Sequence, residues 1–443
     1  MSKDGALPRT PSGERPGAHP LSSRVDGVVA RLHGLHPRLI DLSLERLQKL
    51  LKKLNNPEDR LPRVIHVAGT NGKGSTCAFI RSIGEAAGMR VHVYTSPHLV
   101  RFNERIRIAG ELVTDDNLAE AMETIEQVNA GAPITVFEVI TAVAFHLFAQ
   151  IPADLCVLEV GLGGRGDATN VIAKPASCAI TSISLDHREL LGPTLEVIAA
   201  EKAGILKSGV PVAIGAQPPE VLEVLLALAA KFGASVTLRD RDWHLSGNGT
   251  GFRFRDATRT ISLPATGLAG KFQQDNVGIA IAALSAAGFK ISDAQVADGV
   301  ANVEWPARMQ RLAGRLAGML PPDWELWLDG GHNPGAGIVL GEHLSKWRDC
   351  PVHLIVGMKQ AKDSAEFLRP MLPHVSTVWA VVEPGQHMAL PVEAIIAASG
   401  GVAKPGPTIA DALTALPRQG VPARVLICGS LYLAGEVLKI DGF

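Results

Sequence analysis

The chain repeats one pattern, in which a short apolar run is followed by a longer run with helical character. From about Val64, strands are predicted for RVIHVAG, RVHVYTS, DLCVLEVG and SCAITSISLD. Helices are predicted for GSTCAFIRSIGEAAG, TVFEVITAVAFHLFAQ and TLEVIAAEKAGIL, the last with Thr194 as its N-cap. Strands that are apolar on both faces and alternate with helices indicate a parallel sheet covered on both sides. The predicted fold class is therefore α/β.

Two breaks in this pattern divide the chain. VTLRDRDWHLSGNGTGFRFRDATRTISLP alternates polar and apolar residues between turn glycines, which predicts a small antiparallel excursion before the helix DNVGIAIAALSAAG. EWPARMQRL interrupts the rhythm, and WELWLDGG, PVHLIVGM, VSTVWAVVE and ARVLICGS then restart it. A chain of 443 residues is also too long for one core. We predict a disordered tail at 1–22, a central domain at 23–303, a hinge at 304–310 and a second α/β domain at 311–443.

Composition excludes several classes of function. The net charge of −1 provides no basic excess for nucleic acid or an anionic membrane, and no apolar run approaches the roughly 20 residues needed to span a bilayer. The five cysteines form no CxxC pair, and several lie in apolar runs. This usage is typical of reduced, buried thiols, and so it predicts a cytoplasmic protein.

The stretch HVAGTNGKGST, residues 66–76, nearly matches the phosphate-binding P-loop template G-x-x-x-x-G-K-[ST] but departs from it twice. Val67 stands where the first glycine belongs, and Gly74 follows Lys73 where a hydroxyl residue belongs. Glycines, a helix N-terminus and a lysine nevertheless suit a bound phosphate. The pattern alone leaves open a broken P-loop, a coincidence or a variant with its own chemistry.

Polar residues also follow the other predicted strands. Ser96, Glu159 and the pair Asp186-His187 stand at three strand ends, and ligands of doubly wound sheets bind outside the carboxyl ends of strands. A hydroxyl, a carboxylate and an imidazole beside a phosphate loop suit a divalent cation that keeps some of its water. The alternatives are a helix or turn cap for Ser96, which precedes a proline, and an ordinary hydrogen-bonded histidine for His187.

Three further features carry charge outside these strand ends. Lys202 lies in an apolar helix, and the sequence alone favours an amine that reaches water or pairs with the neighbouring glutamate over one that forms a carbamate. Arg308, in the predicted hinge, is either a phosphate clamp or a surface arginine. In LWLDGGHNPGAG, the residues that either face a nucleotide or form a solvated turn are Asp329, His332 and Asn333.

Taken together, the longer motifs resemble the dihydrofolate synthase/folylpolyglutamate synthase family, a branch of the Mur-ligase-like ATP-dependent amide ligases. The motifs, in the family's order, are HVAGTNGKGST, YTSPHLVRFNERIRI, LEVGLGGRGDATNVI, SISLDH, EKAGILKSGVP, WPARMQRL, LDGGHNP and ICGSLYLAGEVL. The resemblance implies an N-terminal P-loop-type ATP-binding domain and a C-terminal Rossmann-like domain. It also implies that the loop at 66–76 is the family's own variant.

The resemblance further implies roles for individual residues. Contacts to ATP fall on Thr70, Asn71, Gly72, Lys73, Gly74, Ser75, Thr76, Asn276, Arg308 and Asp329. Two magnesium ions, with a monovalent cation in addition, are implied at Ser75, Ser96, Glu159, His187 and a carbamylated Lys202. Catalytic roles are implied for Lys73, His187, Lys202, Arg308 and His332. Contacts to the pterin substrate fall on Asp41, Leu42, Ser43, Thr135, Val136, Phe137, Glu138, Gly166, Asp167 and Ala168.

The implied reaction joins L-glutamate to dihydropteroate and to tetrahydrofolates at the expense of ATP, in a monomeric cytoplasmic enzyme. The alternatives are a folylpolyglutamate synthase alone, another Mur-type amino-acid ligase, or a nucleotide-dependent switch. Asp41 is alternatively a cap for the helix that follows it. The sequence departs from the family at Gly166, where leucine is usual, at Phe272, where histidine is common, and at the glycine pair 330–331, which we expect to be harmless.

Overall fold

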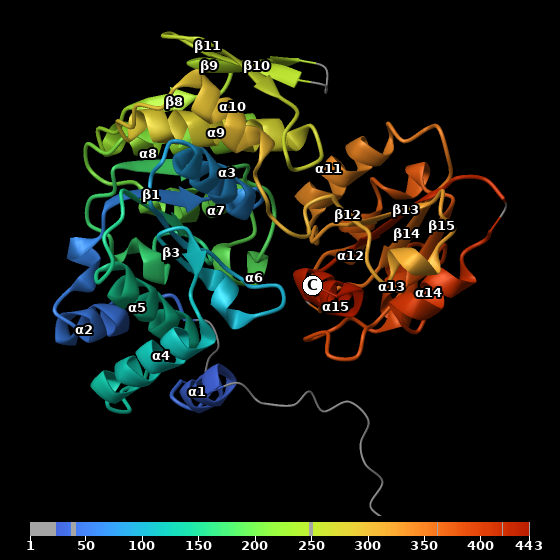
Figure 1. Cartoon of the computed structure of the whole chain (residues 1–443), viewed down its shortest axis with the longest axis horizontal. Coiled ribbons are helices and arrows are strands. Elements are labelled where there is room, and N and C mark those ends of the chain that lie inside the picture. The colour runs from blue at the N-terminus through green and yellow to red at the C-terminus, as the bar shows by residue number, and fades with distance from the viewer. Residues whose placement is uncertain (1–23, 37–40, 248–250, 361, 419, 443) are drawn as a thin grey trace, which may run out of the picture.

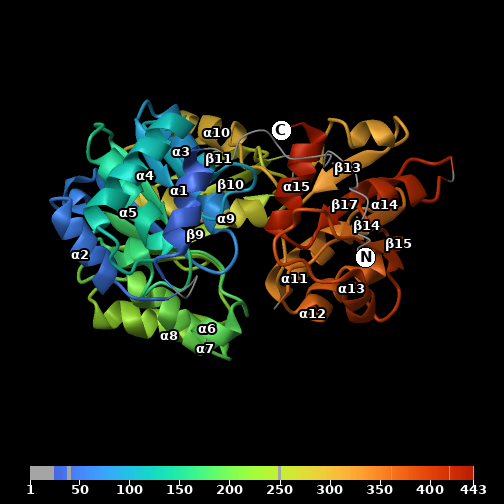
Figure 2. The same cartoon turned by 90° about the horizontal axis from the view of Figure 1, so that it is seen from below.

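The computed structural model describes residues 24–36, 41–247, 251–360, 362–418 and 420–442. They form two lobes that lie side by side in both views (Figures 1 and 2). Each lobe is built on its own mainly parallel sheet, as the sequence predicts. The whole predicted tail at 1–22 lies outside the described residues, and so does residue 23. None of the described helices is long and apolar enough to cross a membrane.

The N-terminal lobe contains an eight-stranded sheet. Its strands, in spatial order, are β4 (Glu111–Leu112), β3 (Ile106–Ile108), β2 (Val91–Tyr94), β5 (Leu155–Glu159), β1 (Arg63–Ala68), β6 (Ser177–Ile180), β7 (Val212–Ile214) and β8 (Val236–Leu238). The strands β2, β5, β1, β6, β7 and β8 run parallel to one another. At the other end of the sheet, β3 and β4 form an antiparallel edge. Because β8 pairs in parallel with β7, the predicted antiparallel excursion begins too early in the sequence.

Helices cover both faces of this sheet. One face carries α3 (Lys73–Ala86), α9 (Phe272–Ala286) and α10 (Asp293–Ala301). The other face carries α1 (Arg24–His33), α2 (Glu45–Lys53), α4 (Asp115–Asn129), α5 (Val136–Phe148), α6 (Arg188–Leu191), α7 (Leu195–Lys202) and α8 (Pro219–Lys231). In β5, Leu155 and Val157 pack on the first face, and Cys156 and Leu158 pack on the second. All four are buried, which explains the apolar strand without alternation.

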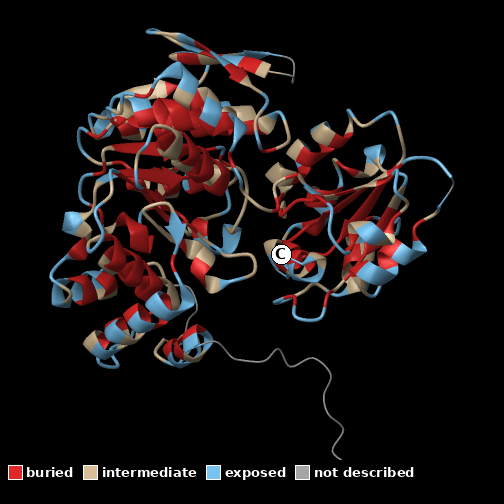
Figure 3. Cartoon of the chain, in the orientation of Figure 1, coloured by how far each residue is buried: buried red, intermediate tan, exposed pale blue. Residues whose placement is uncertain are grey.

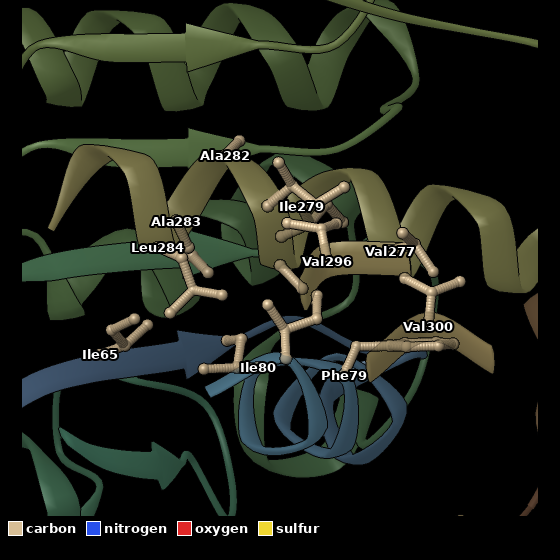
Figure 4. Close-up of a cluster of buried hydrophobic side chains, with 14 of the residues drawn as sticks. Ile65, Phe79, Ile80, Val277, Ile279, Ala282, Ala283, Leu284, Val296 and Val300 are labelled. Carbon is tan, nitrogen blue, oxygen red and sulfur yellow. The ribbon is translucent and has the colours of Figure 1, made fainter. Parts of the chain in front are cut away.

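The core beneath α3 and α9 is close-packed. Figure 4 shows Ile65 of β1, Phe79 and Ile80 of α3, and Ile279 and Leu284 of α9 meeting in one cluster. Buried residues also occupy the central strands of both lobes (Figure 3). This packing fixes the strands whose ends carry the polar residues noted above.

A three-stranded antiparallel sheet lies beside α9 and α10 (Figure 1). Its strands are β9 (Trp243–Gly247), β10 (Gly251–Asp256) and β11 (Thr260–Pro264). Trp243 is fully buried against α9, where a Cβ at Gly278 would come within 2.1 Å of its ring. This part of the predicted antiparallel excursion is confirmed.

The C-terminal lobe contains a six-stranded sheet. Its strands, in spatial order, are β12 (Gln310–Leu312), β13 (Glu325–Leu328), β17 (Arg424–Cys428), β14 (Val352–Val356), β15 (Thr377–Ala380) and β16 (Lys404–Pro405). Only β12 runs antiparallel to its neighbour. The helices of this lobe are α11 (Pro334–Leu344), α12 (Ser364–Leu368), α13 (Val392–Ala398), α14 (Ile409–Ala415) and α15 (Leu431–Asp441). Because β12 begins at Gln310, the last residue of the predicted hinge already belongs to this sheet.

Short 3₁₀ helices complete the described chain. They are η1 (Pro57–Arg60), η2 (Phe102–Arg105), η3 (Ala168–Val171), η4 (Ala203–Ile205), η5 (Ala317–Met319) and η6 (Leu372–His374). In the N-terminal lobe, η2 lies between β2 and β3, η3 lies between β5 and β6, and η4 directly follows α7.

Candidate active site

A cavity of about 540 Å³ lies between the two lobes. Its N-terminal wall includes Glu159, the last residue of β5, and residues that follow β1, β2 and β6, beginning at Gly69, Ser96 and Ser182. Its C-terminal wall comes from residues that follow β13, β14 and β17, including Asp329. The strand ends of two sheets therefore meet at one cavity, as expected for parallel α/β sheets.

The cavity brings together nearly all the residues that the sequence singled out. The predicted site residues that line it are Asp41, Leu42, Ser43, Thr70, Asn71, Gly72, Lys73, Gly74, Ser75, Ser96, Thr135, Phe137, Glu138, Glu159, Gly166, Asp167, Ala168, His187, Lys202, Asn276, Arg308, Asp329 and His332. Thr76 and Val136 are not part of the lining. The Thr76 hydroxyl instead donates to the side-chain oxygen of Asn276 at 3.4 Å, and Val136 packs against the core.

The loop between β1 and α3 is shaped by glycines. Gly72 is the N-cap of α3, has φ of 85°, and would place a Cβ only 2.4 Å from the side-chain oxygen of Asn276. Lys73 begins the helix, and its Nζ donates to the carbonyl of Thr70 at 3.2 Å. The N–H groups of the first helical turn and one ammonium are thus gathered at the cavity, which is an arrangement suited to phosphate.

The second departure from the P-loop template has a steric explanation. A Cβ at Gly74 would lie 2.9 Å from Nε1 of Trp305, which belongs to the connection between the lobes. A serine or threonine at this position would therefore displace the indole. The connection packs directly on the first turn of α3, and only glycine leaves room for it.

Glu159 is a buried carboxylate at the end of β5. Burial raises its pKa, while the nearby charges of Lys73 and Arg308 oppose that shift. Its carboxylate accepts a hydrogen bond from the backbone N–H of Ser96 at 3.2 Å, and Ser75 is buried in the same cavity wall. A buried carboxylate with so little compensation suits a cation bound in the cavity.

The donor set around Glu159 limits what that cation is. Among the residues described by the structure, no group of three or more His, Cys, Asp or Glu side chains is placed to hold a metal on its own. Hydroxyls and one carboxylate, completed by phosphate oxygens and water, are instead the ligands that magnesium prefers. The residues present therefore fit a magnesium ion that binds together with a nucleotide.

His187 lies at the edge of the cavity with Asp186 and Lys362. Burial, with the charge of Lys362, lowers the pKa of His187 to about 4, although Asp186 opposes the shift. His187 is therefore neutral near pH 7 and able to act as a ligand. Lys362 forms an ion pair with Asp186 from the opposite lobe. The sequence prediction missed Lys362 because nothing in its local pattern separates it from a solvated lysine.

Lys202 is buried at the end of α7. Its Nζ donates to the carbonyl of Gly69 at 2.8 Å, and burial, reinforced by Lys73, lowers its pKa to about 7. The alternative that its amine reaches water or pairs with Glu201 is wrong, because the side chain is enclosed and Glu201 faces Arg165 at 3.5 Å. A buried amine that is partly neutral at pH 7 is able to react with carbon dioxide.

The two lobes contact each other directly at the phosphate loop. The side-chain amides of Asn71 and Asn333 exchange hydrogen bonds of 3.1 and 2.9 Å, and Asn333 also donates to Asp186 at 3.0 Å. Nε2 of His332 lies 3.7 Å from the same carboxylate. Although burial raises the pKa of Asp186, the adjacent His332 and the charge of Lys362 outweigh burial and hold that pKa well below its usual range.

Arg308 and Asp329 approach the cavity from the connection and from β13. Asp329 is buried, and its carboxylate accepts from the N–H groups of Met309 at 2.8 Å and Gly331 at 2.7 Å. A Cβ at Gly330 would lie 2.9 Å from Nη1 of Arg308 and 2.4 Å from a methyl of Leu431. Both atoms are the ends of flexible side chains, so an added Cβ would require these side chains to move. The expectation that the glycine pair is a harmless departure stays a prediction.

The alternative cap role of Asp41 is wrong. Helix α2 begins at Glu45, its N-cap is Leu44, and no side chain caps it. The carboxylate of Asp41 instead accepts from Nη1 of Arg46 at 2.9 Å. A genuine capping box lies at the start of α5, where Thr135 and Glu138 bond each other's backbone N–H groups.

A buried relay links β1 to the loop that carries Asp167. The hydroxyl of Thr169 donates to Asp167 at 2.6 Å, so it accepts from Nε2 of His66, which lies 2.8 Å away. Burial lowers the pKa of His66 to about 3, and its Nδ1 has no partner among the described residues. His66 is thus a neutral Nε2–H donor that fixes this loop. The sequence prediction did not include it, because it reads as part of the strand.

Comparison with known proteins agrees with this geometry. The Mur ligase middle domain matches residues 67–284, and the C-terminal domain of dihydrofolate synthetase matches residues 319–440. Folylpolyglutamate synthase of Lacticaseibacillus casei is 36% identical over 93% of this chain and 97% of its own length. Dihydrofolate synthase/folylpolyglutamate synthase of Escherichia coli is 33% identical over 98% of this chain and 97% of its own length.

Solved structures show the same similarity over both lobes. E. coli FolC in complex with DHPP and ADP has a TM-score of 0.85 at 33% identity, over 95% of this chain and 97% of its own. The Yersinia pestis bifunctional enzyme with Mn, AMPPNP and L-glutamate bound has a TM-score of 0.83 at 31% identity, over 95% and 98%. The chain has a Mur-ligase-like fold and belongs to the dihydrofolate synthase/folylpolyglutamate synthase family.

Proposed function

We propose that this chain is an ATP-dependent ligase that joins L-glutamate to dihydropteroate, forming dihydrofolate, and to tetrahydrofolates, extending their glutamate tails. The observation that carries the proposal is the cavity between the lobes described above. A phosphate loop, the segments implied to contact a pterin, and cationic residues of the C-terminal lobe all open into it. Solved relatives bound to ADP with DHPP, or to AMPPNP with L-glutamate, support the same set of ligands.

The reaction proceeds in two steps. A carboxylate oxygen of the pteroate or folate attacks the γ-phosphorus of ATP, and ADP leaves, which gives an acyl phosphate. The amine of glutamate then attacks the acyl carbon, the tetrahedral intermediate collapses, and inorganic phosphate leaves as the amide forms. The protein has little covalent chemistry to perform, so positioning and charge neutralisation account for its contribution.

The charges around the cavity match the charges of this reaction. Lys73 and the first turn of α3 would neutralise the phosphates of ATP, and Arg308 would reach them from the opposite side. The two carboxylates of glutamate need cations on the C-terminal wall, where Lys359 and Lys362 line the cavity. Enclosure between the lobes would keep water from the acyl phosphate.

Ser75, Ser96, Glu159 and the neutral His187 would hold magnesium. A bound magnesium ion supplies Lewis-acid stabilisation of the charge on the phosphate oxygens. We further propose a second magnesium ion and a monovalent cation in the same wall. Lys202 would serve this wall as a carbamate, because its enclosed amine has a pKa of about 7 and lies beside Gly69 of the phosphate loop.

We also propose that the enzyme acts as a monomer in the cytoplasm. One chain supplies both walls of the cavity, so the site needs no second copy. The five cysteines are unpaired, which suits a reducing compartment.

The test is a phosphate-release assay with each substrate left out in turn. We expect phosphate release to require ATP, glutamate and either dihydropteroate or tetrahydrofolate, and to equal the amide formed. ATP hydrolysis that does not depend on glutamate or the pteroate substrate would instead support a nucleotide-dependent switch. Turnover of tetrahydrofolate without any turnover of dihydropteroate would leave a folylpolyglutamate synthase alone.

A further inference from the structure

The cavity wall assigned above to the pterin contains a segment without regular secondary structure, Asp41 to Ser43. It leads into α2 and lines the cavity beside the start of α5 and the loop at 166–168. Within the part of the chain that the structure describes, the segment belongs to no strand or helix. Its position must therefore depend on side-chain contacts, and a shift of the segment would change the shape of the cavity.

Arg46 makes two polar contacts to this segment, and Nε2 of His36 also lies 3.4 Å from the carboxylate of Asp41. Nη1 of Arg46 donates to the carboxylate of Asp41 at 2.9 Å, and its Nη2 donates to the carbonyl of the same residue at 3.0 Å. The guanidinium thus binds both the side chain and the backbone of Asp41. This two-point attachment fixes orientation as well as distance, which a single ion pair does not.

The same guanidinium is anchored on its other side to α5. Nε of Arg46 donates to both carboxylate oxygens of Glu138 at 3.2 Å, and Nη2 lies 3.1 Å from that carboxylate. The Glu138 side chain is only 3% exposed, and it also accepts from the backbone and hydroxyl of Thr135 at 2.7 and 2.8 Å. Glu138 is therefore a rigid anchor, and Arg46 is its only cation among the described residues.

Packing holds the segment from the opposite side. A Cβ at Gly166 would lie 2.9 Å from Cβ of Leu42, so the two backbones approach as closely as a glycine allows. Asp41 is fixed by Arg46 and Leu42 is fixed by the 166–168 loop. The segment at 41–43, the start of α5 and the 166–168 loop all line the cavity, whereas Arg46 itself is not part of the lining.

We propose that Arg46 is a positioning residue. Its guanidinium holds Asp41 next to Glu138 and so determines the shape of the pterin-binding wall, although Arg46 itself does not line the cavity. This inference rests on the proposed function, because it assumes that the segment meets the pteroate or folate substrate. Arg46 touches no reacting atom. Its loss would allow the segment at 41–43 to move and would leave the carboxylate of Glu138 without its cation.

Two substitutions separate positioning from general stability. Arg46→Lys keeps a charge beside Glu138, so the fold should survive, but an ammonium does not reproduce the fork that binds Asp41 twice. Arg46→Met removes both contacts. The matched control is Arg31→Met, because Arg31 makes a similar two-point ion pair with Glu126 between α1 and α4, away from the cavity.

The experiment measures kcat and the KM values for dihydropteroate, ATP and glutamate, together with the thermal unfolding midpoint. We expect the KM for dihydropteroate to rise about 10- to 100-fold in Arg46→Met, since a misplacement of roughly 1 Å has effects of this size. Arg46→Lys should show a smaller rise. The KM values for ATP and glutamate should stay within about twofold in both variants, and Arg31→Met should leave all three KM values within about twofold.

Three results would overturn the inference. A folded Arg46→Met protein with an unchanged KM for dihydropteroate would show that Arg46 does not position this wall. A parallel rise of all three KM values with a lower unfolding midpoint in both Arg46 variants would show a purely structural role. A wild-type protein that neither binds nor turns over pteroate or folate substrates would overturn the proposed function, and the inference with it.

Discussion

The contact between the phosphate loop and the interlobe connection predicts a specific effect of Gly74→Ala. The added Cβ would lie 2.9 to 3.1 Å from three atoms of the Trp305 indole, so the ring has to move. Replacing glycine by alanine inside a helix stabilises by roughly 0.5–1 kcal/mol. Overpacking costs about 1–3 kcal/mol. The free energy of unfolding should therefore fall by between about 0 and 2.5 kcal/mol, which leaves the protein folded.

Activity should fall much further than stability. Trp305 lies three positions before Arg308, and a displacement of roughly 1 Å in this connection should lower kcat/KM about 100-fold. Ligation kinetics and urea unfolding measure the two effects on one preparation. The control is Gly27→Ala in α1, where the nearest atom is 4.0 Å away and activity should not change.

The double variant Gly74→Ala/Trp305→Ala provides the decisive comparison. Because the clash requires the indole, adding Gly74→Ala to Trp305→Ala should cost little further activity. Two results would refute the steric reasoning. One is a Gly74→Ala protein that keeps more than a third of wild-type kcat/KM, and the other is a double variant whose losses simply add.

Lys73→Ala should lower ligation about 100- to 1,000-fold without unfolding the protein, because it removes the ammonium of the phosphate loop; a folded variant with a third of wild-type turnover would contradict this. Since burial lowers the pKa of Lys202 to about 7, its neutral, reactive form increases as the pH rises through that value. Carbamate occupancy, measured by mass spectrometry with bicarbonate present, should therefore increase from about pH 6 to about pH 8, and an unmodified amine in fully active enzyme would exclude the carbamate. Asp41→Ala should reduce kcat/KM for dihydropteroate more than for tetrahydrofolate, and equal losses would remove the case for a pterin contact there.

The sequence predicted the layered α/β organisation because it is encoded locally. The apolar residues of β1, β5 and β14 are buried on both faces, and such runs identify themselves without tertiary information. The strand ends were predictable for the same reason, since topology then places Ser96 and Glu159 beside the phosphate loop. The parallel pairing of β8 was not predictable, because Val236–Leu238 is short and lies next to strongly alternating strands.

The contacts that join distant segments were beyond the sequence pattern. Lys362, Arg46 and His66 acquire their significance only from partners far along the chain. The environment of Lys202 was misread for the same reason. Its enclosure depends on the carbonyl of Gly69, whereas the local pattern offered only the adjacent Glu201. The family resemblance implied a role for Lys202 that periodicity did not, but it pointed to none of Lys362, Arg46 and His66.

An oxygen-transfer experiment tests the proposed reaction most directly. Dihydropteroate labelled with ¹⁸O in its carboxylate is incubated with the enzyme, ATP and glutamate, and the inorganic phosphate is analysed by mass spectrometry. Attack by the carboxylate on the γ-phosphorus predicts that each phosphate released carries one oxygen from dihydropteroate. Phosphate that contains oxygen only from ATP and water, while dihydrofolate is still formed, would contradict the acyl-phosphate mechanism.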